Sequence, residues 1–164
     1  MDQALFVVTL LSALGCGLIA GAFFAFSSFV MKALGRLPAE QGIAAMQSIN
    51  VVVINPVFLG VFVGTAIACA LLAVASLFRL QAAGSGYLVG GGALYVLGTF
   101  AVTMTMNVPR NDALAAVDGK SADGARVWAD YLSSWTAWNT VRTIAALVAC
   151  ASLIAALCRL RAVG

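Results

Sequence analysis

The chain has 164 residues, of which 63% are hydrophobic and 9% are charged, and its formal net charge is +3. Soluble domains are about 45–50% apolar and about 25% charged, so this composition leaves too little polar surface to cover a water-soluble globule. The basic residues form no run comparable to a nucleic-acid footprint, which argues against a nucleic-acid partner. We therefore expect an integral membrane protein whose surface contacts the lipid bilayer.

The uncharged stretches predict four membrane-spanning helices, because a bilayer core requires about 20 apolar helical residues. The expected fold is all-α: a polytopic membrane protein folded as a four-helix transmembrane bundle, with a single domain over residues 1–164. An even number of spans places both chain ends and the 79–86 turn on one side. The expected spans are about 4–31, 51–78, 86–107 and 135–158, with a short polar helical cap at about 108–134.

Span one carries small residues at four-residue spacing, a pattern that favours close approach of a neighbouring helix. These residues are Ala13, Gly17, Gly21 and Ala25. Near the start of span two, Pro56 either kinks one long helix or, with Asn55 as its N-cap, begins a second helix. The sequence leaves these two arrangements open.

Pro109 governs the expected end of span three. A proline disfavours helical dihedral angles at the preceding residue, here Val108, so we expect the helix to end near Asn107. Gly119 is expected to interrupt the cap, and a second polar helix from about Asp123 leads to span four.

Histidine, the commonest metal ligand, is absent from the chain. The four cysteines lie inside apolar runs and form no C-x-x-C pair, so we interpret them as small buried hydrophobic residues. We expect no metal and no cofactor. The cysteines are Cys16, Cys69, Cys150 and Cys158.

Span four places Trp135, Trp138, Asn139 and Arg142 at i, i+3, i+4 and i+7, which predicts that they share one helix face. Arg142 stands roughly 25 Å before Arg159 at 1.5 Å per residue, at or just inside the hydrocarbon boundary. A cation there is unfavourable unless it is paired or hydrated. The candidate partners are Asn50, Asn107, Asn139, Asp112 and Asp130.

Polar and aromatic side chains from distant parts of the chain are expected on the same side of the membrane as this row. They predict a cavity lined by amides, a guanidinium and indoles, open toward the membrane interface and suited to a flat apolar molecule with a polar or anionic oxygen. Three simpler interpretations stay open: a tryptophan belt, amides that join helices, and an Arg142 that reaches the headgroups. The converging residues are Asn50, Asn107, Arg110, Asn111, Trp128, Trp135, Trp138 and Asn139.

The chain resembles the anthrone oxygenase-like family of small four-span membrane proteins. The resemblance rests on GAFFAFSSFVMKAL at 21–34, AAMQSINVVVINPVF at 44–58, MNVPRNDAL at 106–114 and W-x2-Y-x3-W-x2-WNTVRT at 128–143. It implies oxidation of anthrones to anthraquinones with molecular oxygen, in aromatic polyketide pathways and without flavin or haem. The chain departs from the family at Thr140, where similar proteins often have histidine.

The resemblance and the polar row together give an expected function: a cofactor-independent oxygenase, with molecular oxygen as co-substrate, that acts on a hydrophobic, anthrone-like phenolic compound. We assign catalytic roles to Arg142, Asn139, Asn107 and Asn111, and substrate binding to Asn50, Trp128, Trp135, Trp138 and Arg110. Arg142 and Asn139 would stabilise a substrate oxyanion, with Trp135 and Trp138 stacked on the rings. The general base is left open among Asp112, Asp130, Tyr131, a water molecule and unaided ionisation of the substrate.

A second interpretation is a non-catalytic, lipophile-binding or accessory membrane subunit, in which the amides and Arg142 fasten helix ends or contact a partner. It is motivated by the lack of histidine and of a definite base. The expected partners are a hydrophobic aromatic small molecule and the bilayer, with room for a homo-oligomer on the glycine-rich faces. The expected location is the bacterial cytoplasmic membrane.

Overall fold

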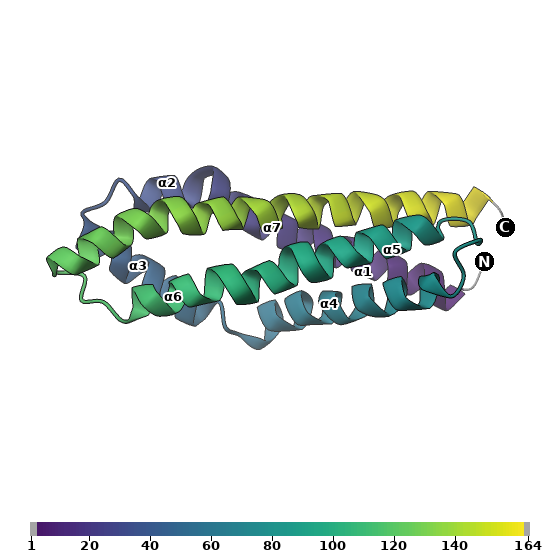
Figure 1. Ribbon diagram of the computed structural model, residues 1–164, viewed down its shortest axis with the longest axis horizontal. Coiled ribbons are helices and arrows are strands. Elements are labelled where there is room, and N and C mark those ends of the chain that lie inside the picture. Colours follow the sequence, from purple (N-terminus) through teal and green to yellow (C-terminus); the bar gives the residue numbers. More distant parts are fainter. Residues whose placement is uncertain (1–2, 163–164) are drawn as a thin grey trace.

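The computed structural model describes residues 3–162, and within them every regular element is a helix. The helices form one long bundle, shown in Figure 1. Four helices in this part of the chain are long and apolar enough to cross a membrane, which confirms the predicted all-α four-helix bundle. They are Gln3–Leu34, Pro56–Leu77, Ser85–Ala115 and Ala122–Leu160.

The first span is one continuous helix made of α1 (Gln3–Ala25), the π-helical turn η1 (Phe26–Val30) and α2 (Met31–Leu34). It packs against α4 and α7. Ala13 is buried there, and a Cβ at Gly17 would lie 3.5 Å from Cys150 Sγ. A Cβ at Gly21 would meet nothing within 4 Å, so the small-residue stripe packs only over its first half.

The second span begins anew at Pro56, the second of the two arrangements left open. After α3 (Ala39–Val52), α4 (Pro56–Leu77) starts with Asn55 as its N-cap. Asn55 Oδ1 accepts hydrogen bonds from the backbone N–H groups of Val57 at 3.1 Å and Phe58 at 3.0 Å. The expected start near residue 51 is therefore corrected to Pro56, because residues 51 and 52 belong to α3.

The third span continues well past Asn107, so its expected end there is wrong. It runs through α5 (Ser85–Ala93), the π-helical segments η2 (Leu94–Ala101) and η3 (Thr103–Asn107), and α6 (Val108–Ala115). Val108 is helical, with φ −59° and ψ −49°, and its N–H donates to Thr103 O, five residues back. This wide turn places Pro109 in the first turn of α6, a position where a proline is tolerated.

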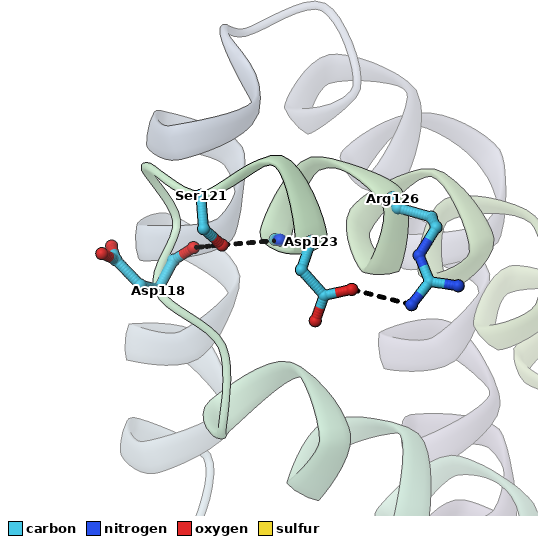
Figure 2. Close-up of polar contacts among 5 residues, drawn as sticks. Asp118, Ser121, Asp123 and Arg126 are labelled. Atoms are coloured by element: carbon cyan, nitrogen blue, oxygen red, sulfur yellow. Dashed lines mark hydrogen bonds and ion pairs between the residues drawn. The ribbon is translucent and has the colours of Figure 1, made fainter.

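The fourth span and the preceding polar helix are one helix, α7 (Ala122–Ala162), of 41 residues. The expected interruption near Gly119 and the polar helix from about Asp123 are confirmed, because α6 ends at Ala115 and α7 begins at Ala122. The expected start of span four at residue 135 is wrong, because α7 continues through it. No proline or glycine occurs in residues 125–162, so nothing in the backbone ends the helix where the side chains turn apolar. Ser121 caps its start: Ser121 Oγ accepts from Gly124 N at 2.9 Å and donates to Asp118 O at 2.7 Å (Figure 2).

The bundle contains two separate hydrophobic clusters. The cap cluster consists of Met31, Ile43, Met46, Leu114, Trp128, Tyr131 and Trp135. It lies among α2, α3, α6 and the first part of α7, at the end of the molecule opposite the α4–α5 turn (Figure 1). The cap thus includes α3, which the expected range of 108–134 left out. The membrane cluster consists of Ala13, Cys16, Ile19, Ala20, Phe23, Phe62, Ala66, Cys69, Leu72, Leu88, Tyr95, Ala146, Ala149, Leu153 and Ala156.

Candidate functional site

A cavity of about 360 Å³ lies where the membrane cluster meets the cap cluster. Phe23 and Phe62 of the membrane cluster line it from one side, and Met46 and Trp135 of the cap cluster from the other. The remaining lining side chains are apolar except for four. The polar lining residues are Asn50, Thr103, Asn111 and Arg142. A mostly apolar hollow with a few converging polar groups is the usual form of a small-molecule site.

Arg142 is the only charged residue on the cavity wall. Its side chain is 5% exposed and donates from Nε and Nη2 to Asn139 Oδ1, at 3.0 and 2.8 Å. Nη1 donates to Thr103 Oγ1 at 3.2 Å. Because an arginine carries five N–H groups, these three bonds leave two N–H groups for another acceptor. The guanidinium carbon lies 3.8 Å from the Phe23 ring centroid and 5.1 Å from that of Trp135.

No carboxylate compensates the charge of Arg142 within residues 3–162. The ion pairs of this part of the chain join Lys120 with Glu40 and Arg126 with Asp123, and all four side chains are exposed. The two aspartates considered as partners of Arg142, Asp112 and Asp130, are exposed and do not line the cavity. A buried cation without a counterion is costly, so the site favours an anionic ligand.

Asn139 orients Arg142 and ties span four to span one. Because a guanidinium only donates, Asn139 must present its carbonyl oxygen to Arg142, and its Nδ2 then faces span one. Nδ2 donates to Phe23 O at 2.7 Å and to Ser27 Oγ at 2.6 Å. Asn139 is fully buried, does not line the cavity and uses its Nδ2 in these bonds, so its predicted role as a donor to the substrate is corrected to positioning of Arg142.

Asn111 and Asn50 also line the cavity and present free polar atoms there. Asn111 Oδ1 accepts from Trp135 Nε1 at 2.7 Å and from Tyr131 OH at 2.8 Å. Since an indole N–H only donates, the amide orientation of Asn111 is fixed and its Nδ2 is left as a donor for a ligand. Asn50 Nδ2 donates to Tyr131 OH at 3.5 Å, which leaves its Oδ1 as an acceptor.

The aromatic residues of α7 form a stack that leads away from the cavity. The Trp135 and Tyr131 rings are 5.6 Å apart with an interplanar angle of 18°, and Tyr131 and Trp128 are 5.8 Å apart with 17°. Only Trp135 of the three lines the cavity. Trp128, expected to bind substrate, is buried in the cap cluster instead.

Two further predicted site residues, Asn107 and Arg110, lie off the cavity wall. Asn107 is fully buried and donates from Nδ2 to Trp135 O at 3.2 Å, while its Oδ1 has no partner within the described residues. Arg110 donates to Ser134 Oγ at 3.1 Å and to Met106 O at 2.6 Å. Both therefore act here as ties between helical segments.

Trp138 is half-buried and does not line the cavity, so the expected stacking role has no geometric support. In a helix of 3.6 residues per turn, Trp138 points about 60° to one side of Trp135, while Asn139 points about 40° to the other. The side chain of Thr140 is also outside the cavity, and its Oγ1 lies 3.0 Å from Ser27 Oγ. Position 140, where the resemblance led us to expect histidine, therefore lies outside the cavity wall of this protein.

The structure adds Phe23, Ser27 and Thr103 to the site. Thr103 had a detectable signal, because it stands four residues before Asn107 on the same helix. Phe23 had none, since a phenylalanine in an apolar span has the same sequence signature whether it faces lipid or a cation. Ser27 is recognisable only through its bond to Asn139.

Within residues 3–162 no group of three or more His, Cys, Asp or Glu side chains is placed to hold a metal ion. Cys16 and Cys69 are buried in the membrane cluster, with their Sγ atoms 3.8 Å apart, which confirms their interpretation as core residues. Cys150 is half-buried. Cys158 is exposed, so its expected burial is wrong.

Comparison with known proteins identifies one family. A family model described as anthrone oxygenase matches residues 58–152, more than half of the chain. The matched region contains Thr103, Asn111, Trp135 and Arg142 of the cavity wall, and Asn50 lies before it. No curated protein and no solved structure matches the chain.

Proposed function

The chain belongs to the anthrone oxygenase family, and from this premise we propose that it is a membrane-embedded, cofactor-independent oxygenase. Its substrate is a hydrophobic, anthrone-like phenolic compound, and its co-substrate is molecular oxygen. The observation that carries the proposal is the guanidinium of Arg142, which is buried, lacks a carboxylate partner within residues 3–162 and lines a mostly apolar cavity.

The chemistry needs no external electron donor. Loss of a proton from the central methylene of an anthrone gives an aromatic enolate, whose negative charge resides largely on oxygen and which is electron-rich enough to reduce molecular oxygen. Over the whole reaction the methylene loses two hydrogens and gains one oxygen atom, and the second oxygen atom leaves as water. The four electrons that reduce molecular oxygen all come from the substrate.

Arg142 has the position and the charge to stabilise the enolate. Its two remaining N–H groups are available to the substrate oxygen, and Asn139 and Thr103 hold the guanidinium before substrate arrives. Donors fixed in advance at a developing negative charge contribute about 10²–10³-fold in rate each. Asn111 Nδ2 adds a neutral donor on the cavity wall.

The aromatic wall supports binding of a flat ring system. Trp135, Phe23 and Phe62 line the cavity, whose volume of about 360 Å³ falls within the range of about 300–1,000 Å³ usual for small-molecule sites. Stacking and edge contacts with such rings contribute about 0.5–1.5 kcal/mol each beyond burial of area. These contacts fix the ring plane relative to Arg142.

For proton removal we propose ionisation of the substrate in the field of Arg142, with water as the proton acceptor. Asp112 and Asp130 are exposed and off the cavity wall. Tyr131 donates its hydroxyl hydrogen to Asn111 and is likewise off the wall. A nearby cation favours the charged form of an acidic group, so Arg142 promotes the ionisation directly.

A second candidate function, a non-catalytic lipophile-binding or accessory subunit, is favoured by the backbone bonds of the amides. Asn139 bonds to Phe23 O and Asn107 to Trp135 O, which are contacts that fasten helices. Under this function, the unmodified protein consumes no oxygen above the autoxidation rate of an added anthrone.

The test is oxygen consumption by purified protein with dithranol, corrected for autoxidation, in the unmodified protein and in Arg142→Leu. The matched control is Arg126→Leu, which removes an exposed cation from the same helix. We expect Arg142→Leu to lower kcat/KM by about 10²-fold or more and the control to change it little. Equal rates for Arg142→Leu and the unmodified protein remove Arg142 from the mechanism.

A further inference from the structure

The turn between α3 and α4 exposes a dense group of large apolar side chains. We call residues 51–57 the elbow. The exposed fractions within it are 72% for Val51, 68% for Val52, 70% for Ile54 and 79% for Val57. The surfaces of soluble proteins rarely present such a contiguous apolar patch. We therefore expect the elbow to contact apolar surroundings and not water.

The position of the elbow identifies those surroundings as the bilayer. α4 begins at Pro56 and its 22 residues span roughly 33 Å, about the thickness of a hydrocarbon core. The elbow therefore lies at the membrane boundary, and its apolar surface continues along α4 through Ile67 and Leu71, which are 57% and 65% exposed. A surface continuous with the lipid-facing side of a spanning helix is covered by lipid.

The elbow is also part of the cavity wall. Val53 and Ile54 line the cavity together with Leu59 of α4, and Met104 of η3 lies on the wall as well. Ile54, Leu59 and Met104 are 70%, 38% and 49% exposed, whereas Arg142 on the same wall is 5% exposed. These three side chains thus reach from the cavity to the outer surface of the bundle.

The cavity is closed in the direction of the cap. Met46 and Trp135, which line it there, are 1% and 3% exposed and belong to the packed cap cluster. Gln47 Nε2 donates to Leu114 O at 2.9 Å and thereby fastens α3 to α6. Passage from the cap end would require the cap cluster to open, whereas passage past the elbow requires only side-chain movement.

We propose that the aromatic substrate enters the cavity sideways from the lipid phase, through a portal between the elbow and η3 that is bounded by Ile54, Leu59 and Met104. This inference rests on the proposed function for the identity of the ligand. The hydrophobic substrate dissolves in the bilayer, passes an apolar rim and meets the polar groups only at the inner wall, on Arg142 and Asn111.

The test narrows the portal with an indole in Leu59→Trp and in Met104→Trp. The matched controls are Ile67→Trp on α4 and Leu97→Trp on η2, which are also exposed to lipid but do not line the cavity. Each protein, in lipid nanodiscs, is mixed with 1,8-dihydroxyanthraquinone, a stable probe that does not react further with oxygen. Stopped-flow absorbance then gives the loading rate and the release rate.

For a portal, both narrowing variants slow loading and release together, by about tenfold, and the controls match the unmodified protein. Unchanged loading in both variants overturns the portal. Weaker affinity with faster release also overturns it, because the two residues then line only the binding site. If both narrowing variants slow loading and release but the unmodified protein does not oxidise dithranol, the oxygenase function is contradicted and the portal is supported. If the unmodified protein takes up no quinone, both fall.

Discussion

The guanidinium of Arg142 lies against the ring of Phe23, with the guanidinium carbon 3.8 Å from the ring centroid. The same two residues are joined a second time through Asn139, which accepts from Arg142 and donates to the Phe23 carbonyl oxygen at 2.7 Å. Spans one and four are thus locked together at the point where the cation lines the cavity. The position of the charge is therefore fixed by packing in the ligand-free protein.

Replacement of Phe23 by leucine removes the ring under the cation. We expect Phe23→Leu to lower the free energy of unfolding by about 1–3 kcal/mol, from lost core packing and from a lost cation–π contact. Phe24→Leu is the control, because Phe24 is 56% exposed on the next position of the helix. Chemical denaturation in detergent measures the difference. Equal stabilities would show that the contact contributes nothing.

Asn139→Asp supplies Arg142 with a carboxylate and so cancels the charge offered to the substrate. We expect kcat/KM for dithranol to fall by about tenfold or more, because the paired guanidinium attracts an oxyanion less. Both Asn139→Asp and Asn139→Leu remove the Nδ2 donor to Phe23 O. Asn139→Leu removes the acceptor of Arg142 as well and should lower stability more, by about 2–4 kcal/mol. Unimpaired oxidation by the Asp variant would contradict a role for the uncompensated charge.

Tyr131→Phe tests whether this hydroxyl serves as the base. Trp135 Nε1 still donates to Asn111 in the variant, so Asn111 keeps its orientation. The two lost hydrogen bonds, to Asn111 Oδ1 and from Asn50 Nδ2, cost about 1 kcal/mol of stability each. We expect dithranol oxidation to stay within about threefold of the unmodified protein, since base catalysis contributes about 10²–10⁴-fold where it operates. A loss on the latter scale would identify Tyr131 as the base.

Gly92→Ala tests the close approach of α4 and α5. A Cβ at Gly92 would collide with the Cys69 backbone carbonyl oxygen and lie 2.8 Å from Ala73 Cβ, so we expect a loss of about 1–3 kcal/mol in stability. Gly90→Ala is the matched control, since its Cβ would meet nothing within 4 Å and alanine favours the helix by about 0.5–1 kcal/mol. The melting temperatures should therefore move in opposite directions.

The four spans were predictable from the sequence because each needs only a long apolar stretch, whereas the ends of the helices were not. Pro109 was expected to end span three, but the wide π-helical turn at η3 admits it into α6. Such a turn depends on the packing of η3 and α6 against α7 and leaves no signal in the local sequence. The side chains of α7 change from polar to apolar along the helix, which suggests a boundary between two helices. The backbone nevertheless stays helical throughout.

The polar part of the cavity wall was predictable for a related reason. Asn50, Asn111 and Arg142 attract notice because polar groups near a membrane span need a partner, and the structure places all three on one cavity. Trp138 was grouped with Trp135 because spacing alone resolves a helix face only coarsely. Which aromatic side chain faces the cavity depends on tertiary packing.

The membrane cluster lines one part of the cavity, which we call the floor, and the cap cluster lines another part, which we call the roof. The two clusters meet at Arg142, whose guanidinium carbon lies 3.8 Å from the ring centroid of Phe23 in the membrane cluster and 5.1 Å from that of Trp135 in the cap cluster. A roof residue such as Met46 shapes the cavity without taking part in the hydrogen bonds that hold Arg142, so its replacement is expected to alter the shape of the cavity and to leave the guanidinium in place. The shape of the cavity and the position of its charge are thus set by different residues of one wall.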